Sequence, residues 1–177
     1  GVASISMAFA FLIVLMTTIV SDGYTAFFTT EIKLTVDLSA DELGLVGQDI
    51  NQQTLMSASF RKVIRKAILD DVPVNGRQNK RQLYKFLSNG AEYDLRDMVI
   101  ADPSLIGKRI EYWAQAGDNF NQYNKGNITA AIPEDGRQFK NLQIQWYDEL
   151  VKEGNVRTVF NTNFFTNGDS RDAELAG

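Results

Sequence analysis

The order of apolar and polar residues divides the chain into an apolar N-terminal stretch and a longer region of mixed character. Residues 2–20 contain no charged residue, no Pro and no Gly. As an α-helix this stretch is roughly 28 Å long, close to the ~30 Å hydrocarbon core of a bilayer. Hydroxyl groups, which can donate to backbone carbonyls of the preceding turn, are carried by Ser4, Ser6, Thr17 and Thr18. We therefore predict a transmembrane helix over residues 1–22 and a second domain over residues 23–177.

Three other interpretations explain the apolar stretch less well. A buried helix of a soluble protein is usually shorter and has a polar stripe, because one of its faces meets water. A cleaved signal peptide has a basic region before an apolar run of ~7–15 residues, whereas this run is longer and follows Gly1 directly. A pilin-like anchor carries Glu near the fifth residue, where this chain has Ile5. Because the chain starts with Gly rather than Met, we expect the natural protein to have residues before it.

Aromatic residues follow the apolar stretch directly. Tyr24, Phe27 and Phe28 come just after Asp22 and Gly23. Aromatic rings at this place are typical of the headgroup region of a bilayer, where an apolar ring and its polar edge both find suitable surroundings. An equally good interpretation is that these rings cap the core of the domain that follows. The three aromatic residues are thus candidates for contact with the membrane interface.

Strict alternation of apolar and polar residues predicts strands. Residues 30–38, TEIKLTVDL, show the clearest alternation, which indicates a strand with one buried face. Residues 108–114, KRIEYWA, alternate in the same way, and residues 156–165, VRTVFNTNFF, provide a third strand.

Apolar residues that recur at steps of three and four predict helices over residues 54–71, 79–88, 92–101 and 139–152. Residues 118–127 fit either a short helix or a loop, and residues 39–53 and 103–107 each have room for a helical turn. The order of these elements predicts an α+β domain. We expect a small mixed or antiparallel sheet of about three strands, packed against four or five helices.

One face of the predicted helix over residues 54–71 is basic. Its cations are Arg61, Lys62, Arg65 and Lys66. Such a face suits contact with acidic lipid or with a partner, but a solvated helix face is the preferred interpretation.

The composition excludes several classes of function. The 177 residues include no Cys and no His. This removes thiol nucleophiles, disulfides, Cys-based zinc sites and the commonest general base near neutral pH. The net charge of −4 argues against nucleic acid as a partner, because nucleic acid requires clustered Lys and Arg. No glycine-rich phosphate-binding loop is present.

Acidic pairs are the remaining candidates for acid–base chemistry. They are Asp41-Glu42, Asp70-Asp71 and Glu134-Asp135. Each pair lies beside a turn or a helix end, and nothing in the sequence places two of them on facing strands, so solvated turn residues are the preferred interpretation. We therefore expect no enzymatic activity, no catalytic residue, no cofactor and no bound metal.

Two stretches of the sequence resemble a known family of membrane transporters. Residues 93–109 read YDLRDMVIADPSLIGKR, and residues 160–177 read FNTNFFTNGDSRDAELAG. Both are similar to the N-terminal region of PstA-type phosphate ABC transporter permeases of proteobacteria, and the resemblance covers essentially the whole chain. It implies a first membrane helix, then a periplasmic domain, then further permease helices after residue 177. By this resemblance the chain is part of a longer permease and cannot transport phosphate alone.

The resemblance also implies a location and partners. Residues 24–177 are expected in the periplasm, at the bacterial inner membrane, where they dock the phosphate-binding protein or modulate gating. The implied partners are the membrane, the other permease subunit, the ATPase subunits and the periplasmic phosphate-binding protein. Candidates for polar contacts with such a partner are Arg96, Arg157 and Arg171, although an ion pair within the domain explains each of them equally well.

A membrane-tethered sensor or adaptor that binds a small ligand is the alternative function. A membrane span followed by a compact α+β domain is also the layout of extracytoplasmic sensors. This alternative requires a pocket with converging polar groups.

Overall fold

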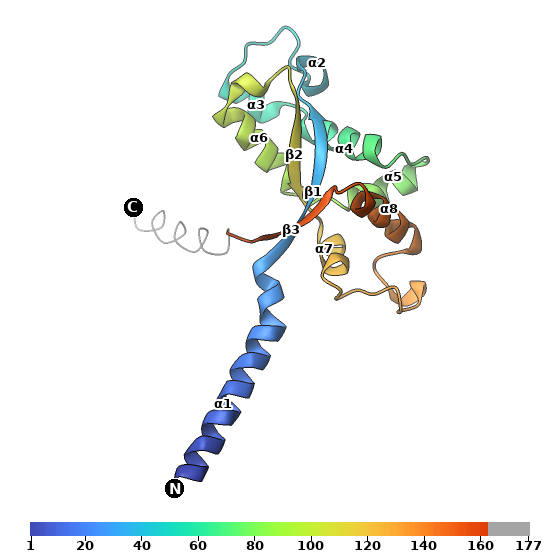
Figure 1. Cartoon of the computed structure of the whole chain (residues 1–177). Coiled ribbons are helices and arrows are strands. Elements are labelled where there is room, and N and C mark those ends of the chain that lie inside the picture. Colours follow the sequence, from blue (N-terminus) through green and yellow to red (C-terminus); the bar gives the residue numbers. More distant parts are fainter. Residues whose placement is uncertain (163–177) are drawn as a thin grey trace. The chain divides into compact units, whose positions relative to one another are not determined.

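A computed structural model of the chain describes residues 1–162, which divide into two compact units (Figure 1). Unit 1 consists of residues 1–29 together with residues 158–162, and unit 2 consists of residues 30–157. Unit 1 contains the apolar helix, and unit 2 contains the hydrophobic core.

Unit 1 begins with helix α1 (Val2–Gly23), which is followed by the 3-10 helix η1 (Tyr24–Phe27). Every residue of α1 is exposed, including all of its large apolar side chains. The segment Val2–Phe27 reaches a mean hydropathy of 2.3, so it is long and apolar enough to cross a membrane.

Hydroxyl groups in the second half of α1 are satisfied within the helix itself. Thr17 and Thr18 donate to the carbonyl oxygens of Ile13 and Val14, at 2.8 and 2.9 Å. This confirms the expected bonding to the preceding turn for Thr17 and Thr18. It also makes the two side chains compatible with hydrocarbon, where an unsatisfied polar group costs several kcal/mol (about 2 or more).

The predicted sheet is confirmed as a three-stranded antiparallel sheet with the order β2-β1-β3. Its strands are β1 (Phe28–Asp37), β2 (Arg109–Gln115) and β3 (Val156–Phe160). Strand β3 ends earlier than predicted, and residues 163–165 of the predicted strand lie outside the described residues.

Strand β1 buries every second side chain, as its alternating sequence predicts. Ile32, Leu34 and Val36 are all 0% exposed. On β2 they stand opposite Ala114, Tyr112 and Ile110 respectively. Because side chains in a strand alternate between its faces, this register puts the apolar residues of both strands on one side of the sheet.

Seven α-helices follow α1 in the described residues, against the four or five predicted. They are α2 (Ala40–Leu43), α3 (Gln52–Ser57), α4 (Phe60–Asp71), α5 (Arg77–Tyr84), α6 (Ala91–Ala101), α7 (Asp118–Asn124) and α8 (Asn141–Lys152), with the 3-10 helices η2 (Pro103–Leu105) and η3 (Glu134–Gly136). The α+β class is confirmed, and the added helices are short ones. Helix α4 packs on α2, α5 and α6, and α6 packs on β2.

The predicted helix over residues 54–71 is in fact two helices, α3 and α4. The break lies at Ala58, whose ψ of 157° is extended. The N–H of Ser59 donates to the carbonyl oxygen of Leu43, at 3.0 Å, instead of bonding within a helix. A tertiary hydrogen bond therefore interrupts a stretch whose apolar spacing alone is continuous.

The predicted helix over residues 79–88 ends early, at Tyr84. The chain then runs beside the end of β2, where Leu87 forms an isolated β-bridge with Ala116. The N–H of Gly117 donates to the carbonyl oxygen of Phe86, at 2.7 Å. Pairing with another segment thus ends this helix sooner than its sequence pattern indicates.

Phe86 occupies the centre of an aromatic cluster. Its ring centroid lies 4.8 Å from that of Phe120, 5.6 Å from that of Phe139 and 6.1 Å from that of Trp146. Edge-to-face and offset contacts of this kind stabilise a core beyond the area they bury, by about 0.5–1.5 kcal/mol for each pair. The cluster therefore holds α7, α8 and the segment after α5 together.

A buried arginine orders the loop between α7 and α8. Arg137 is only 4% exposed. Its guanidinium donates to the carbonyl oxygens of Phe139 (2.5 Å), Ala130 (3.1 Å) and Ile132 (2.9 Å), and to the side chain of Asn141. These acceptors replace the water that the buried charge has lost.

Replacement of Gly117 by Ala is expected to destabilise unit 2. A Cβ at this position would lie 2.2 Å from the carbonyl oxygen of Lys85, so the backbone must shift. We expect a loss of about 2–4 kcal/mol, measured by thermal or urea unfolding with the fluorescence of Trp113 and Trp146 as the signal. Gly90→Ala is the matched control, because Gly90 has φ −79° and its nearest contact is 3.6 Å away. Equal stability of the two variants would contradict the close approach.

Candidate functional site

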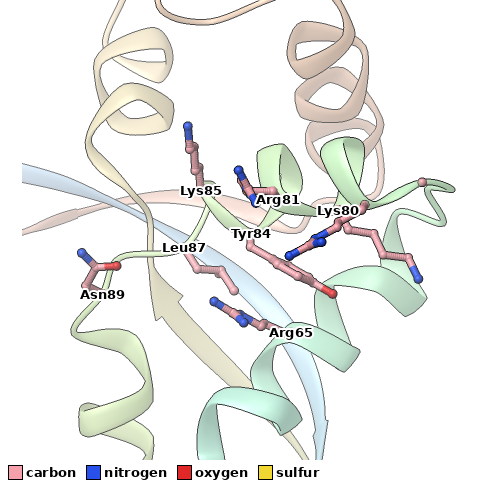
Figure 2. A pocket seen from close by; sticks show the side chains of 9 residues that line it. Arg65, Lys80, Arg81, Tyr84, Lys85, Leu87 and Asn89 are labelled. Carbon is pink, nitrogen blue, oxygen red and sulfur yellow. The ribbon is translucent and has the colours of Figure 1, made fainter.

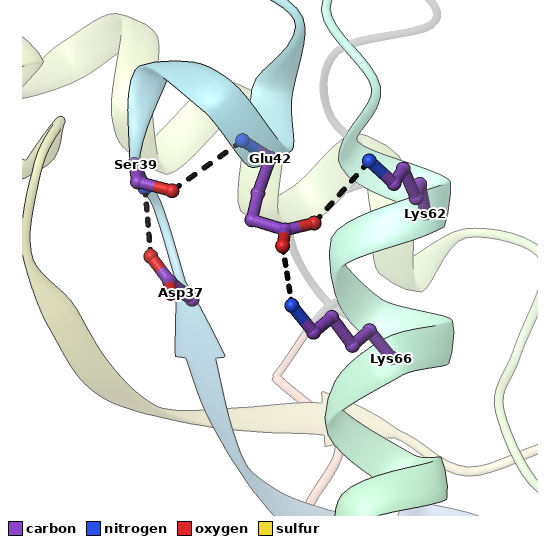
Figure 3. Close-up of polar contacts among 5 residues, drawn as sticks. All are labelled: Asp37, Ser39, Glu42, Lys62 and Lys66. Carbon is purple, nitrogen blue, oxygen red and sulfur yellow. Dashed lines mark hydrogen bonds and ion pairs between the residues drawn. The ribbon is translucent and has the colours of Figure 1, made fainter.

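The basic face of α4 is largely neutralised by carboxylates of the same unit. Glu42 on α2 accepts from Lys66 and lies 3.3 Å from the ammonium of Lys62 (Figure 3). Arg61 pairs with Glu92 on α6, with its Nε 2.9 Å from Oε2. The four cations are exposed, as expected for a solvated helix face, but three of them also have an acidic partner.

Glu42 is placed for this role by the start of α2. The hydroxyl of Ser39, the N-cap residue, accepts from the N–H of Glu42 at 3.4 Å, and the N–H of Ser39 donates to Asp37 at 3.0 Å (Figure 3). The hydrogen bonds from Lys66 and Lys62 lower the pKa of the Glu42 carboxyl.

Arg65 is the fourth cation of α4, and it forms no ion pair with any described residue. Its guanidinium carbon lies 4.7 Å from the ring centroid of Tyr84 on α5. A cation over an aromatic ring at this distance is attracted by the negative face of the ring. The contact joins Arg65 to α5.

Helix α5 presents a basic stripe. Arg77, Arg81 and Lys85 recur at steps of four, and Lys80 precedes Tyr84 by four residues. Residues with this spacing share one face of a helix. The opposite face is anchored by Leu83, which is 0% exposed. The four cations are exposed, and none of them forms an ion pair within residues 1–162.

Together these side chains line an open cavity of about 650 Å³, called here the basic groove. Its cations are Arg65, Arg77, Lys80, Arg81 and Lys85. Figure 2 shows Arg65 reaching from α4 toward the ring of Tyr84, with Leu87 and Asn89 on the segment after α5. None of the described residues that line the groove is acidic. The groove is therefore a region of concentrated positive charge on a chain whose net charge is −4.

Sequence reasoning missed the basic groove, although a signal for it exists. Residues 72–91 contain four basic residues and no Asp or Glu. The basic residues of α4 drew attention instead, and three of those are paired. A count of charged residues over a window of about twenty residues finds these four cations. Residues 72–91 have an excess of positive charge, whereas the chain as a whole has a net charge of −4.

The chemistry of the basic groove is that of anion binding. Its lining offers guanidinium and ammonium donors but no carboxylate, and the chain has no His, so the groove contains no general base that works near neutral pH. Arg and Lys donors of this kind bind carboxylates and phosphates. In the part of the chain that the structure describes, no three acidic side chains gather in a group that could hold a metal ion.

Unit 1 contains a second feature of interest, an aromatic cluster that follows α1. The ring of Phe28 lies 5.8 Å from that of Tyr24 and 5.7 Å from that of Phe160. Phe27 stacks on Phe160 at 6.4 Å, with the ring planes 13° apart. The three membrane-interface candidates thus come together with Phe160, a residue that sequence reasoning did not select. Tyr24 and Phe160 stay about half exposed, at 51% and 48%.

Two of the three arginine candidates for partner contact have partners within unit 2. Arg157 pairs with Glu31, with its Nε 2.7 Å from Oε2, and its guanidinium carbon lies 4.1 Å from the ring centroid of Trp113. Arg96 lies 3.3 Å from the carboxylate of Asp97 and stacks on Tyr93 at 5.0 Å. Neither Arg96 nor Arg157 lines the basic groove.

The third candidate, Arg171, lies outside the described residues. All three arginines remain candidates for contact with a partner.

Asp71 is the acidic residue that departs most from its ordinary state. It lies at the end of α4 and is partly buried, whereas Asp70 is exposed, as predicted for a solvated turn. Burial of the Asp71 carboxyl, together with the negative charges of Glu153 and Asp70, raises its pKa from 3.8 to about 6. Lys33 opposes this shift.

Comparison with known proteins yields one family. A model of DUF3333, described as a domain of unknown function, matches residues 1–134 of the 177 residues. The chain belongs to the DUF3333 family. The DUF3333 match contains α1, Tyr24, Phe27, Phe28 and the whole basic groove, whereas Phe160 lies outside it. No curated protein and no solved structure matches the chain.

Replacement of Asp71 by Asn is expected to stabilise the DUF3333 chain at about pH 7. The native carboxyl holds its proton up to a pKa of about 6, whereas the unfolded one releases it near 3.8, so ionisation costs stability as the pH rises between these values. The full shift would correspond to about 3 kcal/mol, and solvent screening at this half-exposed group reduces the expected gain to about 1 kcal/mol.

Thermal unfolding of this variant should be measured at about pH 7 and about pH 4. The stabilisation should be much smaller at the lower pH, because the native carboxyl is protonated there and only the unfolded one is partly ionised. Asp49→Asn, at an exposed loop residue, is the control for the change in net charge and should have no such effect. A gain in stability of the same size at both pH values would contradict a raised pKa of the Asp71 carboxyl.

Proposed function

We propose that this chain is the N-terminal part of a PstA-type permease of an ABC transporter for inorganic phosphate. In this proposal α1 is the first membrane helix and unit 2 is a domain on the periplasmic side of the bacterial inner membrane. Two features support this proposal. Residues 93–109 and 160–177 resemble the permease family, and α1 is long and apolar enough to cross a membrane.

The return of the chain to the end of α1 is the observation that carries the proposal. The N–H of Asn161 donates to the carbonyl oxygen of Phe27, at 2.7 Å. The ring of Phe160 packs on those of Phe27 and Phe28. The chain thus leaves α1 at η1 and comes back to the same place after unit 2. A domain inserted between two membrane helices requires this arrangement, because both of its ends must lie at the bilayer surface.

The aromatic cluster supports the same interpretation. Tyr24 and Phe160 combine a large ring with partial exposure, and they lie within unit 1, directly after a helix of membrane length. Aromatic side chains are enriched where a membrane helix meets the headgroup layer. In our proposal this cluster lies in that layer and fixes the depth of α1.

The exposed surface of α1 also agrees with a place among other permease helices. Its apolar side chains have no contact partners in unit 1 that bury them, so they require lipid or neighbouring helices. Ser4 and Ser6 are small residues that permit close approach of another helix. The partners in this proposal are the other permease subunit, the ATPase subunits and the phosphate-binding protein. Unit 2 docks that binding protein or modulates gating, without catalysis of its own.

A membrane-tethered sensor or adaptor is the second candidate function, and the basic groove favours it. Converging cations around Tyr84 are what a domain needs to take up a small anionic ligand. A thermal-shift panel of phosphate, nucleotides and amino acids tests this function. A ligand at a hundred times its Kd stabilises by about 2.7 kcal/mol, so a panel without any shift would exclude a sensor for these ligands.

The transporter proposal is tested on the complete gene. The reading frame is expected to continue past codon 177 into further apolar helices, and disruption of the gene is expected to abolish uptake of radiolabelled phosphate at low external concentration. A stop codon soon after codon 177, or unchanged uptake, would contradict the proposal.

The location of unit 2 is tested by cysteine labelling, which the absence of native Cys makes simple. Gln53→Cys, at an exposed residue of α3, is expected to react in whole cells with a maleimide that does not cross the inner membrane. Met7→Cys in the middle of the apolar stretch is the matched control and should react only after denaturation, because lipid surrounds it. Labelling of the Gln53 variant only after the inner membrane is opened would place unit 2 on the other side.

A further inference from the structure

We propose that the basic groove is a docking site for an extended acidic segment of a partner protein. The proposal rests on the charge and spacing of the groove residues and not on the transporter proposal. The proposed occupant is an extended chain segment with a carboxylate at every second residue.

The pairing of charges in unit 2 singles out this groove. Lys62, Lys66 and Arg61 lie on the same helix as Arg65, and each of the three has a carboxylate partner. No described carboxylate pairs with Arg65 or with the four cations of α5 and its end. Unit 2 therefore neutralises the cations beside the groove and leaves those inside it available to a ligand.

The arrangement of cations on α5 is unfavourable for the helix itself. Arg77 and Arg81 are four residues apart, as are Arg81 and Lys85, and like charges at this spacing repel each other. Arg77 also lies at the N-terminus of α5, where the helix dipole disfavours a cation. A bound anion removes these costs, so the groove is expected to bind carboxylates more tightly than isolated surface cations would.

The spacing of the cations matches an extended peptide. Along α5 the positions of Arg77, Arg81 and Lys85 rise by ~6 Å from one to the next. Alternate side chains of an extended chain recur every ~6.6 Å. An extended segment that lies along α5 can therefore place a carboxylate at each of the three cations, while Tyr84 and Leu87 provide apolar contact.

Other anions fit the groove less well. A single phosphate contacts donors within ~3 Å of its oxygens, whereas these cations are spread over a length of ~12 Å. A bilayer presents a flat surface of headgroups, whereas the groove is concave and encloses about 650 Å³. Nucleic acid carries charge far more densely than such a protein segment, so it requires a larger cluster of Lys and Arg than the five cations of the groove.

The test uses the full chain in nanodiscs of zwitterionic lipid and a fluorescein-labelled peptide in which Glu alternates with Ser. Fluorescence anisotropy measures the Kd of this peptide. Arg81→Gln with Lys85→Gln is expected to raise the Kd by at least about fivefold, because two exposed charge pairs are lost. Arg77→Gln with Lys80→Gln is a second, independent variant with the same expectation. Lys108→Gln with Lys152→Gln removes the same charge from exposed residues outside the groove and should change the Kd by less than about twofold.

Four results would overturn the proposal. An equal rise of the Kd in the control variant would show that only net charge matters. Complete displacement of the peptide by millimolar inorganic phosphate would make the ligand a simple oxyanion. Tight binding to vesicles of anionic lipid, without binding to the peptide, would make it a membrane surface. Self-association of the chain that the groove variants abolish would make it a second copy. Thermal unfolding verifies that each variant is folded, so that weaker binding reports on the groove.

Discussion

The structure of unit 2 depends on strand β1 as the centre of its sheet. β1 pairs with β2 along one edge and with β3 along the other, and its residues Ile32, Leu34 and Val36 are completely buried. About seventy residues separate β1 from β2, and they form the helices that follow β1 in the chain. Of these, α4 and α6 pack on each other and α6 packs on β2. Pairing with β2 and β3 also satisfies the backbone N–H and C=O groups along both edges of β1.

The same core determines where the charges of the surface gather. Helix α4 turns Val63 and Ile64 inward, and this orientation brings its cations beside α2 and α6, which supply Glu42 and Glu92. Helix α5 is held by Leu83, and none of the described residues that line the groove beside it is acidic. Neutralised and unpaired cations therefore lie within one turn of each other on α4. The basic groove is a consequence of packing, and the concentration of positive charge in it follows from this unequal pairing.

Much of the fold could be predicted from local pattern alone, and the errors have one kind of cause. The alternation in residues 30–38 predicted β1, and the apolar steps in residues 92–101 predicted α6. The break at Ala58 and the early end of α5 were missed because a hydrogen bond from Ser59 to Leu43 and a bridge from Leu87 to Ala116 join segments distant in sequence. Periodicity describes which face of an element is apolar, but it contains no information about which other segment will compete for the backbone.

The sequence by itself determined the membrane-length helix, the α+β class and the absence of Cys and His chemistry, because each follows from residue type and spacing along the chain. Tertiary structure alone decided which cations are paired. Lys66 and Arg81 are both exposed basic residues of a helix, yet one meets Glu42 and the other faces an acid-free groove. It also decided that Phe160 returns to Phe27 and Phe28. Charge neutralisation and aromatic packing act over a few ångströms in space, whereas 24 residues separate Glu42 from Lys66 and more than a hundred separate Phe160 from Phe27.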